Sequence, residues 1–125
     1  MIVGVGIDIV DVQQLRRMTP TAFQRLAHRV LTEAELEYCL SQPDPHQCLA
    51  ARFAAKEALA KALQLPDPHQ IPFKDAEILG APPRLKATGK ALQALKEKNA
   101  THIHVSLSHT PTTATAIVIL EAQAD

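Results

Sequence analysis

The sequence predicts a single α+β domain in which an antiparallel sheet packs against one long helix. Apolar residues alternate with glycine or polar residues near both ends of the chain, as in half-buried strands. The middle holds an alanine- and leucine-rich segment without glycine or proline, which is typical of a helix. The length of 125 residues allows one hydrophobic core but not a catalytic domain plus a lid, so the expected domain covers residues 1–125.

Residues 2–9 form the first expected strand. One face carries branched apolar side chains and should lie on the core, namely Val3, Val5, Ile7 and Ile9. The other face carries Gly4, Gly6 and Asp8, so a carboxylate ends the strand beside two glycines. The glycines would let a ligand approach the backbone closely. The alternative that Asp8 only caps the next turn stays open from the strand alone.

Four helical segments are expected after this strand. They are a short amphipathic segment over 11–18, a basic helix starting at Thr19-Pro20, a helix from a capping box at Thr32 to about Ser41, and the longest helix over 46–63.

The rest of the chain is expected to be mostly strand. Residues 73–79 and 84–87 are strand-like, 89–98 form a helix, and 103–108 and 113–120 form a closing hairpin. On the first hairpin strand, Ile103, Val105 and Leu107 should face the core.

Composition and the N-terminal run exclude several classes of partner. The formal net charge is zero, which argues against bulk nucleic acid, and one Tyr, three Phe and no Trp leave few rings for base stacking. Residues 1–12 lack a leading Lys or Arg and are interrupted by Asp8 and Asp11, so they form neither a secretory signal nor a membrane span. We therefore expect a cytoplasmic protein in which Cys39 and Cys48 are reduced thiols.

The long helix carries a second candidate group. Glu57 and Lys61 are four residues apart and share a face with the small residues Ala50 and Ala54. Glu57 would supply a hard oxygen ligand to Mg²⁺, and Lys61 would offer a point charge to phosphate. The alternative is an ordinary surface Glu–Lys pair, which the helix taken alone favours.

The closing hairpin places histidines and serines on one face of its first strand. A Ser–His hydrolase is excluded because the serines do not follow a nucleophile-elbow pattern. His102 and His104 lack a third metal ligand, so we interpret them as exposed strand histidines. His109, at the strand end, stays a candidate site residue.

In this order the segments resemble the single-domain 4′-phosphopantetheinyl transferases, the holo-(acyl carrier protein) synthases. The resemblance covers nearly the whole chain, through MIVGVGIDIVDV at 1–12, residues 23–37, ARFAAKEALAKAL at 51–63, F-x-D-x-E-I at 73–78 and HVSLSHTPTTATAIVILE at 104–121. It implies transfer of the 4′-phosphopantetheine group of coenzyme A to a serine of apo acyl carrier protein, with release of 3′,5′-ADP. Fatty acid biosynthesis is the implied setting, although the particular carrier protein stays open.

The resemblance also implies roles for individual residues. Asp8 and Glu57 match the two acidic positions that hold Mg²⁺, and Lys61 matches the lysine that contacts the coenzyme A phosphates; these three form the expected catalytic group. Further coenzyme A contacts are implied for Arg52, Gly80, Pro82 and His109. The family is typically a homotrimer with active sites at subunit interfaces, so His109 and the metal residues would come from different chains. Whether a metal-bound water or Glu57 accepts the serine proton stays open.

A basic surface on the early helices resembles the family's docking site for an acidic carrier protein, and comprises Arg16, Arg17, Met18, Arg25 and Arg29. An ordinary solvated helix face is the alternative.

Two positions depart from the family pattern. Ala81 stands where a lysine is common, which implies either replacement by Arg84 or weaker coenzyme A binding. Gln13 and Gln14 stand where basic residues are common.

Two other functions are kept as alternatives. One is a trimeric module of the same fold that binds coenzyme A or a nucleotide without transferase activity, and the other is a structural trimer without a ligand. Asp8, Glu57 and Lys61 together disfavour both, because a pure binder needs no metal pair. No nucleic-acid or membrane partner is expected.

Overall fold

A computed structural model describes residues 1–123 and shows a single α+β domain. Residues 124–125 of the expected domain lie outside the described part. The elements are β1 (Ile2–Asp11), α1 (Val12–Arg16), α2 (Pro20–Val30), α3 (Glu33–Leu40), α4 (Pro45–Leu63), η1 (Pro68–Gln70), η2 (Phe73–Asp75), β2 (Ala76–Leu79), β3 (Arg84–Ala87), α5 (Gly89–Glu97), β4 (His102–His109) and β5 (Thr113–Glu121).

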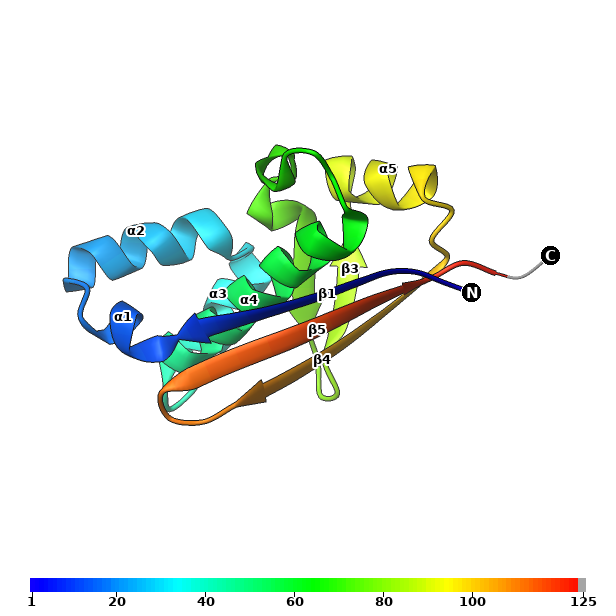
Figure 1. Ribbon diagram of the computed structural model, residues 1–125. Helices are drawn as coiled ribbons and strands as arrows, with labels where there is room; N and C mark the ends of the chain where they lie inside the picture. The colour runs from blue at the N-terminus through cyan, green and yellow to red at the C-terminus, as the bar shows by residue number, and fades with distance from the viewer. Residues whose placement is uncertain (124–125) are drawn as a thin grey trace.

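The strands form two antiparallel sheets. One has three strands in the order β1-β5-β4, and the other is the hairpin of β2 and β3. At the centre of the larger sheet, Ala116 of β5 pairs with Asp8 of β1 and Leu107 of β4. Figure 1 shows α4 running along one face of this sheet, with α2 near one end and α5 near the other. The predicted arrangement of an antiparallel sheet on a long helix is confirmed.

Helix α4 is long because its ends are capped and its interior is rich in helix formers. The Asp44 side chain accepts a hydrogen bond from the Gln47 amide, Pro45 takes the first helical position, and Gln64 ends the helix in the left-handed region with φ of 55°. The face toward the sheet is lined by fully buried alanines, namely Ala54, Ala58 and Ala62. These small side chains let the helix lie close to the strands.

The two glycines of β1 serve this close packing. A Cβ atom on Gly6 would lie 1.9 Å from the Ala58 carbonyl oxygen, and one on Gly4 would lie 2.1 Å from the Ala62 carbonyl oxygen. The glycine face of β1 is therefore the core face. The prediction that the branched face lies on the core is wrong for Val5, Ile7 and Ile9, although Val3 packs against the core as predicted. The idea that the glycines admit a ligand is wrong as well. The outward side chains of Val5, Ile7 and Ile9 are 52%, 61% and 70% exposed.

The other strands follow the expected alternation. Ile103, Val105 and Leu107 of β4 pack against the core, as predicted, and His104 on the opposite face is exposed. The core side of β5 is fully covered through Ala114, Ala116, Val118 and Leu120. Residues 73–75 form a 3₁₀ turn, so β2 begins at Ala76 rather than at Phe73.

A second cluster of buried residues joins α2, α3 and the first half of α4. Within it, Cys39 of α3 and Cys48 of α4 form a disulfide, with Cα atoms 5.4 Å apart. The prediction of reduced thiols is therefore wrong. It rested on the expected compartment, whereas packing of α3 against α4 brings the two cysteines within bonding distance.

A buried ion pair also joins α3 and α4. The Lys56 ammonium donates to a Glu35 carboxylate oxygen at 2.6 Å and to the Val30 carbonyl at 2.6 Å, and both side chains are almost fully buried. Glu35 also accepts from the Thr32 and Ile78 amides, so the predicted capping box also anchors β2. Because both carboxylate oxygens of Glu35 accept hydrogen bonds, the cost of burying its negative charge is offset.

None of the helices in residues 1–123 combines the length and hydropathy needed to cross a bilayer.

Candidate active site

Asp8 is held between β1 and α4. It follows Gly4 and Gly6 on the core face of the strand, and its side chain is 17% exposed. The Lys61 ammonium donates to its carboxylate at 3.0 Å and to the Ile7 carbonyl at 3.0 Å. The sequence placed both residues in the catalytic group without predicting a contact between them, and the structure shows that the Lys61 ammonium is paired with the Asp8 carboxylate.

Glu57 lies one helical turn before Lys61, on the stretch of α4 that passes over β1. Gly4 packs against Ala62, and Gly6 packs against Ala58. A step of two residues forward along β1 therefore corresponds to a step of four residues, about one turn, toward the N-terminus of α4. By the same step, the next inward residue, Asp8, is expected to lie beside Ala54, at the start of the helical turn that also carries Glu57. Helical side chains lean toward the N-terminus, which explains how Lys61 reaches back to Asp8.

The donor set at this position suits Mg²⁺. Asp8 and Glu57 offer hard carboxylate oxygens, and Asp8 already attracts the Lys61 cation. Residues 1–123 hold no group of three or more His, Cys, Asp or Glu that could bind a metal by themselves. Mg²⁺ commonly keeps water and phosphate oxygens beside one or two protein carboxylates, so two acidic residues fit this ion.

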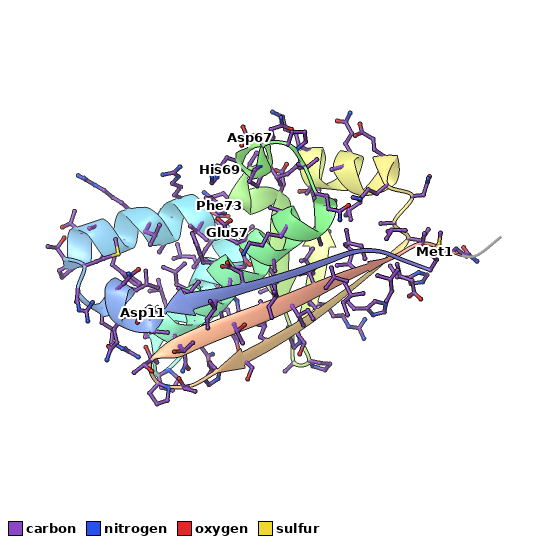
Figure 2. All side chains as sticks on the ribbon, in the orientation of Figure 1. Met1, Asp11, Glu57, Asp67, His69 and Phe73 are labelled. Atoms are coloured by element: carbon purple, nitrogen blue, oxygen red, sulfur yellow. A yellow bond between two sulfur atoms is a disulfide. The ribbon has the colours of Figure 1, made fainter. Side chains whose placement is uncertain are left out.

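A cavity of 240 Å³ opens beside Glu57. Figure 2 shows Glu57 on α4 in the same region as Phe73 and His69, and all three side chains line this cavity together with Arg29 of α2. Neither His69 nor Phe73 is predicted from the sequence to be a site residue. Phe73 belongs to the family-like motif at 73–78, whereas His69 stands in a loop without any pattern that would have identified it.

A second cavity, of 420 Å³, brings together the four residues expected to contact coenzyme A outside the catalytic group. Arg52 and His109 line it with Gly80 and Pro82 of the β2–β3 loop. Ala81 lines it too, whereas Arg84 is exposed and is not among its lining residues. The structure therefore does not place Arg84 where the usual lysine would stand.

Arg52 is the buried cation of this second cavity. It is only 5% exposed, and its guanidinium carbon lies 4.7 Å from the centroid of the Tyr38 ring. Burial lowers the pKa of Arg52 from its usual value, although nearby Tyr38 and Glu35 oppose the shift. Its Nε atom is fully buried and has no hydrogen-bond partner within the described chain.

Within a single chain, the residues around Asp8 and the residues around Arg52 lie apart. Arg52 and Lys61 are nine residues apart on α4, which places them on opposite sides of the helix. The cavity beside Glu57 and the cavity beside Arg52 have no lining residue in common. Within the described chain, the candidate residues therefore fall into two separate groups, one of Asp8, Glu57 and Lys61 and the other of Arg52, Gly80, Pro82 and His109.

The basic residues of the early helices differ in how far they are engaged by hydrogen bonds within the chain. Arg16 donates to both Asp44 carboxylate oxygens, at 3.0 and 2.6 Å, and to the Pro111 carbonyl at 3.1 Å. Hydrogen bonding from Arg16 holds the pKa of Asp44 below its usual range. The other three arginines of the group, Arg17, Arg25 and Arg29, are exposed. Met18 is half-buried.

A family model described as the 4′-phosphopantetheinyl transferase superfamily matches residues 4–118. The chain belongs to this superfamily. It is 41% identical to the holo-[acyl-carrier-protein] synthase of Syntrophus aciditrophicus, with all of both chains covered. It is 46% identical to the holo-[acyl-carrier-protein] synthase of Treponema denticola, with 97% of this chain and 99% of the relative covered.

A solved transferase structure shares the fold. It is the holo-(acyl-carrier-protein) synthase of Bacillus anthracis in complex with coenzyme A (3′,5′-ADP), which is 29% identical to this chain. The TM-score is 0.78, and the match covers 98% of this chain and 99% of the solved one.

Proposed function

We propose that this protein is a holo-(acyl carrier protein) synthase, which moves the 4′-phosphopantetheine group of coenzyme A onto a serine of apo acyl carrier protein. The observation that carries the proposal is the contact of Asp8 with Lys61 beside the turn of Glu57, in a chain whose superfamily match spans residues 4–118. Two full-length relatives with the synthase name and a structural relative with coenzyme A bound support the same activity.

Asp8 and Glu57 would hold the metal, and Lys61 would contact the phosphates. A Mg²⁺ ion bound there supplies Lewis-acid neutralisation of the pyrophosphate charge. Lys61 turns from Asp8 toward a phosphate oxygen and stabilises the charge that develops on the leaving group. The pairing distance of 3.0 Å shows that its ammonium is already beside the acidic centre.

The transfer forms one bond and breaks one. The carrier serine oxygen bonds to the β-phosphorus of coenzyme A, and the bond from that phosphorus to the bridging oxygen breaks. The leaving group is 3′,5′-ADP, which keeps the bridging oxygen. The serine proton passes to Glu57 or to a water beside it, and both acceptors remain open.

The carrier protein would dock on the exposed arginines of α1 and α2. Arg29 lines the cavity beside Glu57, so a carrier bound to α2 has a path from the docking helix to the metal residues. Arg25 and Arg17 are exposed on the same early helices and would attract an acidic partner. Arg16 is engaged by Asp44, so we expect it to contribute less to docking than the free arginines.

We also propose a homotrimer in which the two groups of candidate residues are half-sites, and half-sites of neighbouring chains complete one active site. The outer face of the three-stranded sheet supports this assembly, because its exposed Val5, Ile7 and Ile9 lie beside half-buried Ile117 and Ile119. Such a contiguous apolar face is typical of a protein interface. Asp8 lies on the same strand between Ile7 and Ile9, and its side chain points to the opposite face, toward α4.

A cytoplasmic location stays a prediction from the sequence. The Cys39–Cys48 bond does not support it, because disulfides are rare in that compartment.

Carrier mass is the direct test of the activity. The protein is incubated with apo carrier protein, coenzyme A and Mg²⁺, and we expect a mass gain of one phosphopantetheine group. Asp8→Ala and Glu57→Ala should each abolish the Mg²⁺-dependent gain while circular dichroism and oligomer size stay unchanged. Glu97→Ala, which removes an exposed carboxylate on α5, serves as the matched control. No mass gain over several carriers, under conditions where an established transferase works, contradicts the activity. Near wild-type transfer by either acidic variant contradicts the metal assignment.

A further inference from the structure

Among the tyrosine and phenylalanine side chains, all of which lie in the described residues, only Tyr38 is exposed. The chain has one Tyr, three Phe and no Trp. Phe23 packs on His46 with ring centroids 4.2 Å apart, and Phe53 packs on Phe73 at 5.5 Å. Tyr38 is 39% exposed, and it lines the cavity that also holds Arg52. An exposed ring in a cavity of 420 Å³ is a recognition surface for a planar ligand group.

The Tyr38 ring and Arg52 form one unit within that cavity. The guanidinium carbon lies 4.7 Å from the ring centroid, so the cation covers part of the ring. Arg52 is only 5% exposed, and its Nε has no hydrogen-bond partner in the described chain. A buried donor without a partner is costly.

The backbone on both sides of this unit is fixed. Cys39 follows Tyr38 directly on α3, and Cys48 precedes Arg52 by one turn on α4, so the disulfide between the cysteines ties the two helices together. Pro82 of the β2–β3 loop also lines the cavity and adds an apolar surface. The ring is thus held in place before any ligand binds, which lowers the entropy cost of recognition.

We propose that Tyr38 determines nucleotide specificity by stacking on the purine base of the 3′-phosphoadenosine half of coenzyme A, with Arg52 donating to an acceptor of the same nucleotide. The inference rests on the proposed function, because that function puts this nucleotide in the reaction. Nucleotide bases stack well on aromatic side chains, and Arg adds a cation–π contribution. Pyrophosphate and metal contacts belong to the Asp8 half-site, so Tyr38 acts on base recognition and not on the transfer step.

Binding of 3′,5′-ADP to the full-length protein tests the role of the ring. Isothermal titration compares wild type, Tyr38→Leu, Tyr38→Phe and the matched control Leu40→Ala. Leu40 is 62% exposed on the same helix and does not line the cavity. We expect Tyr38→Leu to weaken 3′,5′-ADP binding about tenfold, which corresponds to about 1.4 kcal/mol. Tyr38→Phe and Leu40→Ala should bind as wild type does. Binding of inorganic pyrophosphate with Mg²⁺, which lacks a base, should be equal in all four proteins.

Proton NMR provides a second readout, because Tyr38 is the only tyrosine and its ring signals need no assignment among several residues. Stacking of adenine should shift these signals upfield as 3′,5′-ADP is added. Unchanged 3′,5′-ADP binding by Tyr38→Leu, or bound 3′,5′-ADP without a shift of the Tyr38 signals, overturns the inference while the transferase assay still stands. Failure of wild type both to bind 3′,5′-ADP and to modify a carrier overturns the proposed function, and this inference with it.

Discussion

At the scale of single residues, the proposed function gives Lys61 two roles that compete, pairing with Asp8 and contact with phosphate. Its ammonium pairs with Asp8 at 3.0 Å, and its side chain is still 55% exposed. An exposed pair of this kind is worth only a few tenths of a kcal/mol to about 1 kcal/mol, so the lysine can leave the carboxylate when a stronger cation arrives. We infer that Lys61 neutralises Asp8 before metal binding and turns to the substrate phosphates afterwards.

The Lys61→Met variant separates these two duties. Removal of the competing ammonium should strengthen Mg²⁺ binding about two- to fivefold in the absence of coenzyme A, which is the size expected for an exposed ion pair. Transfer to the carrier should nevertheless slow on the order of a hundredfold, because the phosphate charge loses a positioned donor. Titration calorimetry with Mg²⁺ and the carrier mass assay measure the two effects. Weaker Mg²⁺ binding by Lys61→Met would show that the lysine supports the metal site and does not compete with it.

At the scale of elements, the packing of α4 on β1 determines where Asp8 points. The strand pattern predicted the element correctly but assigned its faces wrongly, because alternation alone does not say which face another element covers. The decisive signal was the combination of Gly4 and Gly6 with the alanines of α4, since only side chains this small let helix and strand approach so closely. The same close packing turns Asp8 toward the turn of Glu57.

A methyl group on Gly6 tests this packing. In Gly6→Ala the new Cβ would lie 1.9 Å from the Ala58 carbonyl oxygen, and the backbone of α4 must move to admit it. We expect the free energy of unfolding to fall by about 3 kcal/mol, the upper part of the range for overpacked cores. Urea unfolding at one fixed protein concentration measures the change, with Ser108→Ala at an exposed position of β4 as control. A loss below about 0.5 kcal/mol, the range of ordinary surface substitutions, would contradict the close contact.

Other features of the elements could not be predicted from local patterns. The capping box at Thr32 was predicted, yet nothing in that motif showed that Glu35 would also bind the buried Lys56 and the Ile78 amide. The Cys39–Cys48 bond likewise depends on how α3 packs on α4, which the spacing of the cysteines does not show. Long-range packing decides both, whereas helix caps and strand alternation are local properties that a sequence displays directly.

At the scale of the whole molecule, the proposed homotrimer would complete the candidate site by bringing residues of neighbouring chains together. The family resemblance named Asp8, Glu57 and Lys61 and, separately, Arg52, Gly80, Pro82 and His109, and the structure gathers the last four in one cavity. The sequence and the resemblance did not name Tyr38 or His69, because neither stands in a motif and each reaches its cavity through tertiary packing. The apolar outer face of β1 and β5 offers the surface on which a second copy would bring its half-site to Asp8.

Mixing two inactive variants tests the shared site. Asp8→Ala lacks the metal half, and His109→Ala lacks a contact of the other half, so we expect each homo-oligomer to transfer little or no phosphopantetheine. When the two variants are co-expressed, random assembly of a head-to-tail ring puts an intact Asp8 opposite an intact His109 at about a quarter of the interfaces. The mixed protein should therefore recover about a quarter of wild-type activity in the carrier mass assay. Co-expression of two variants of the same half-site, Asp8→Ala with Glu57→Ala, is the matched control and should recover nothing, because the two metal residues lie on one chain. If the first mixture also recovers nothing while sizing shows that mixed oligomers form, each site is made by a single chain.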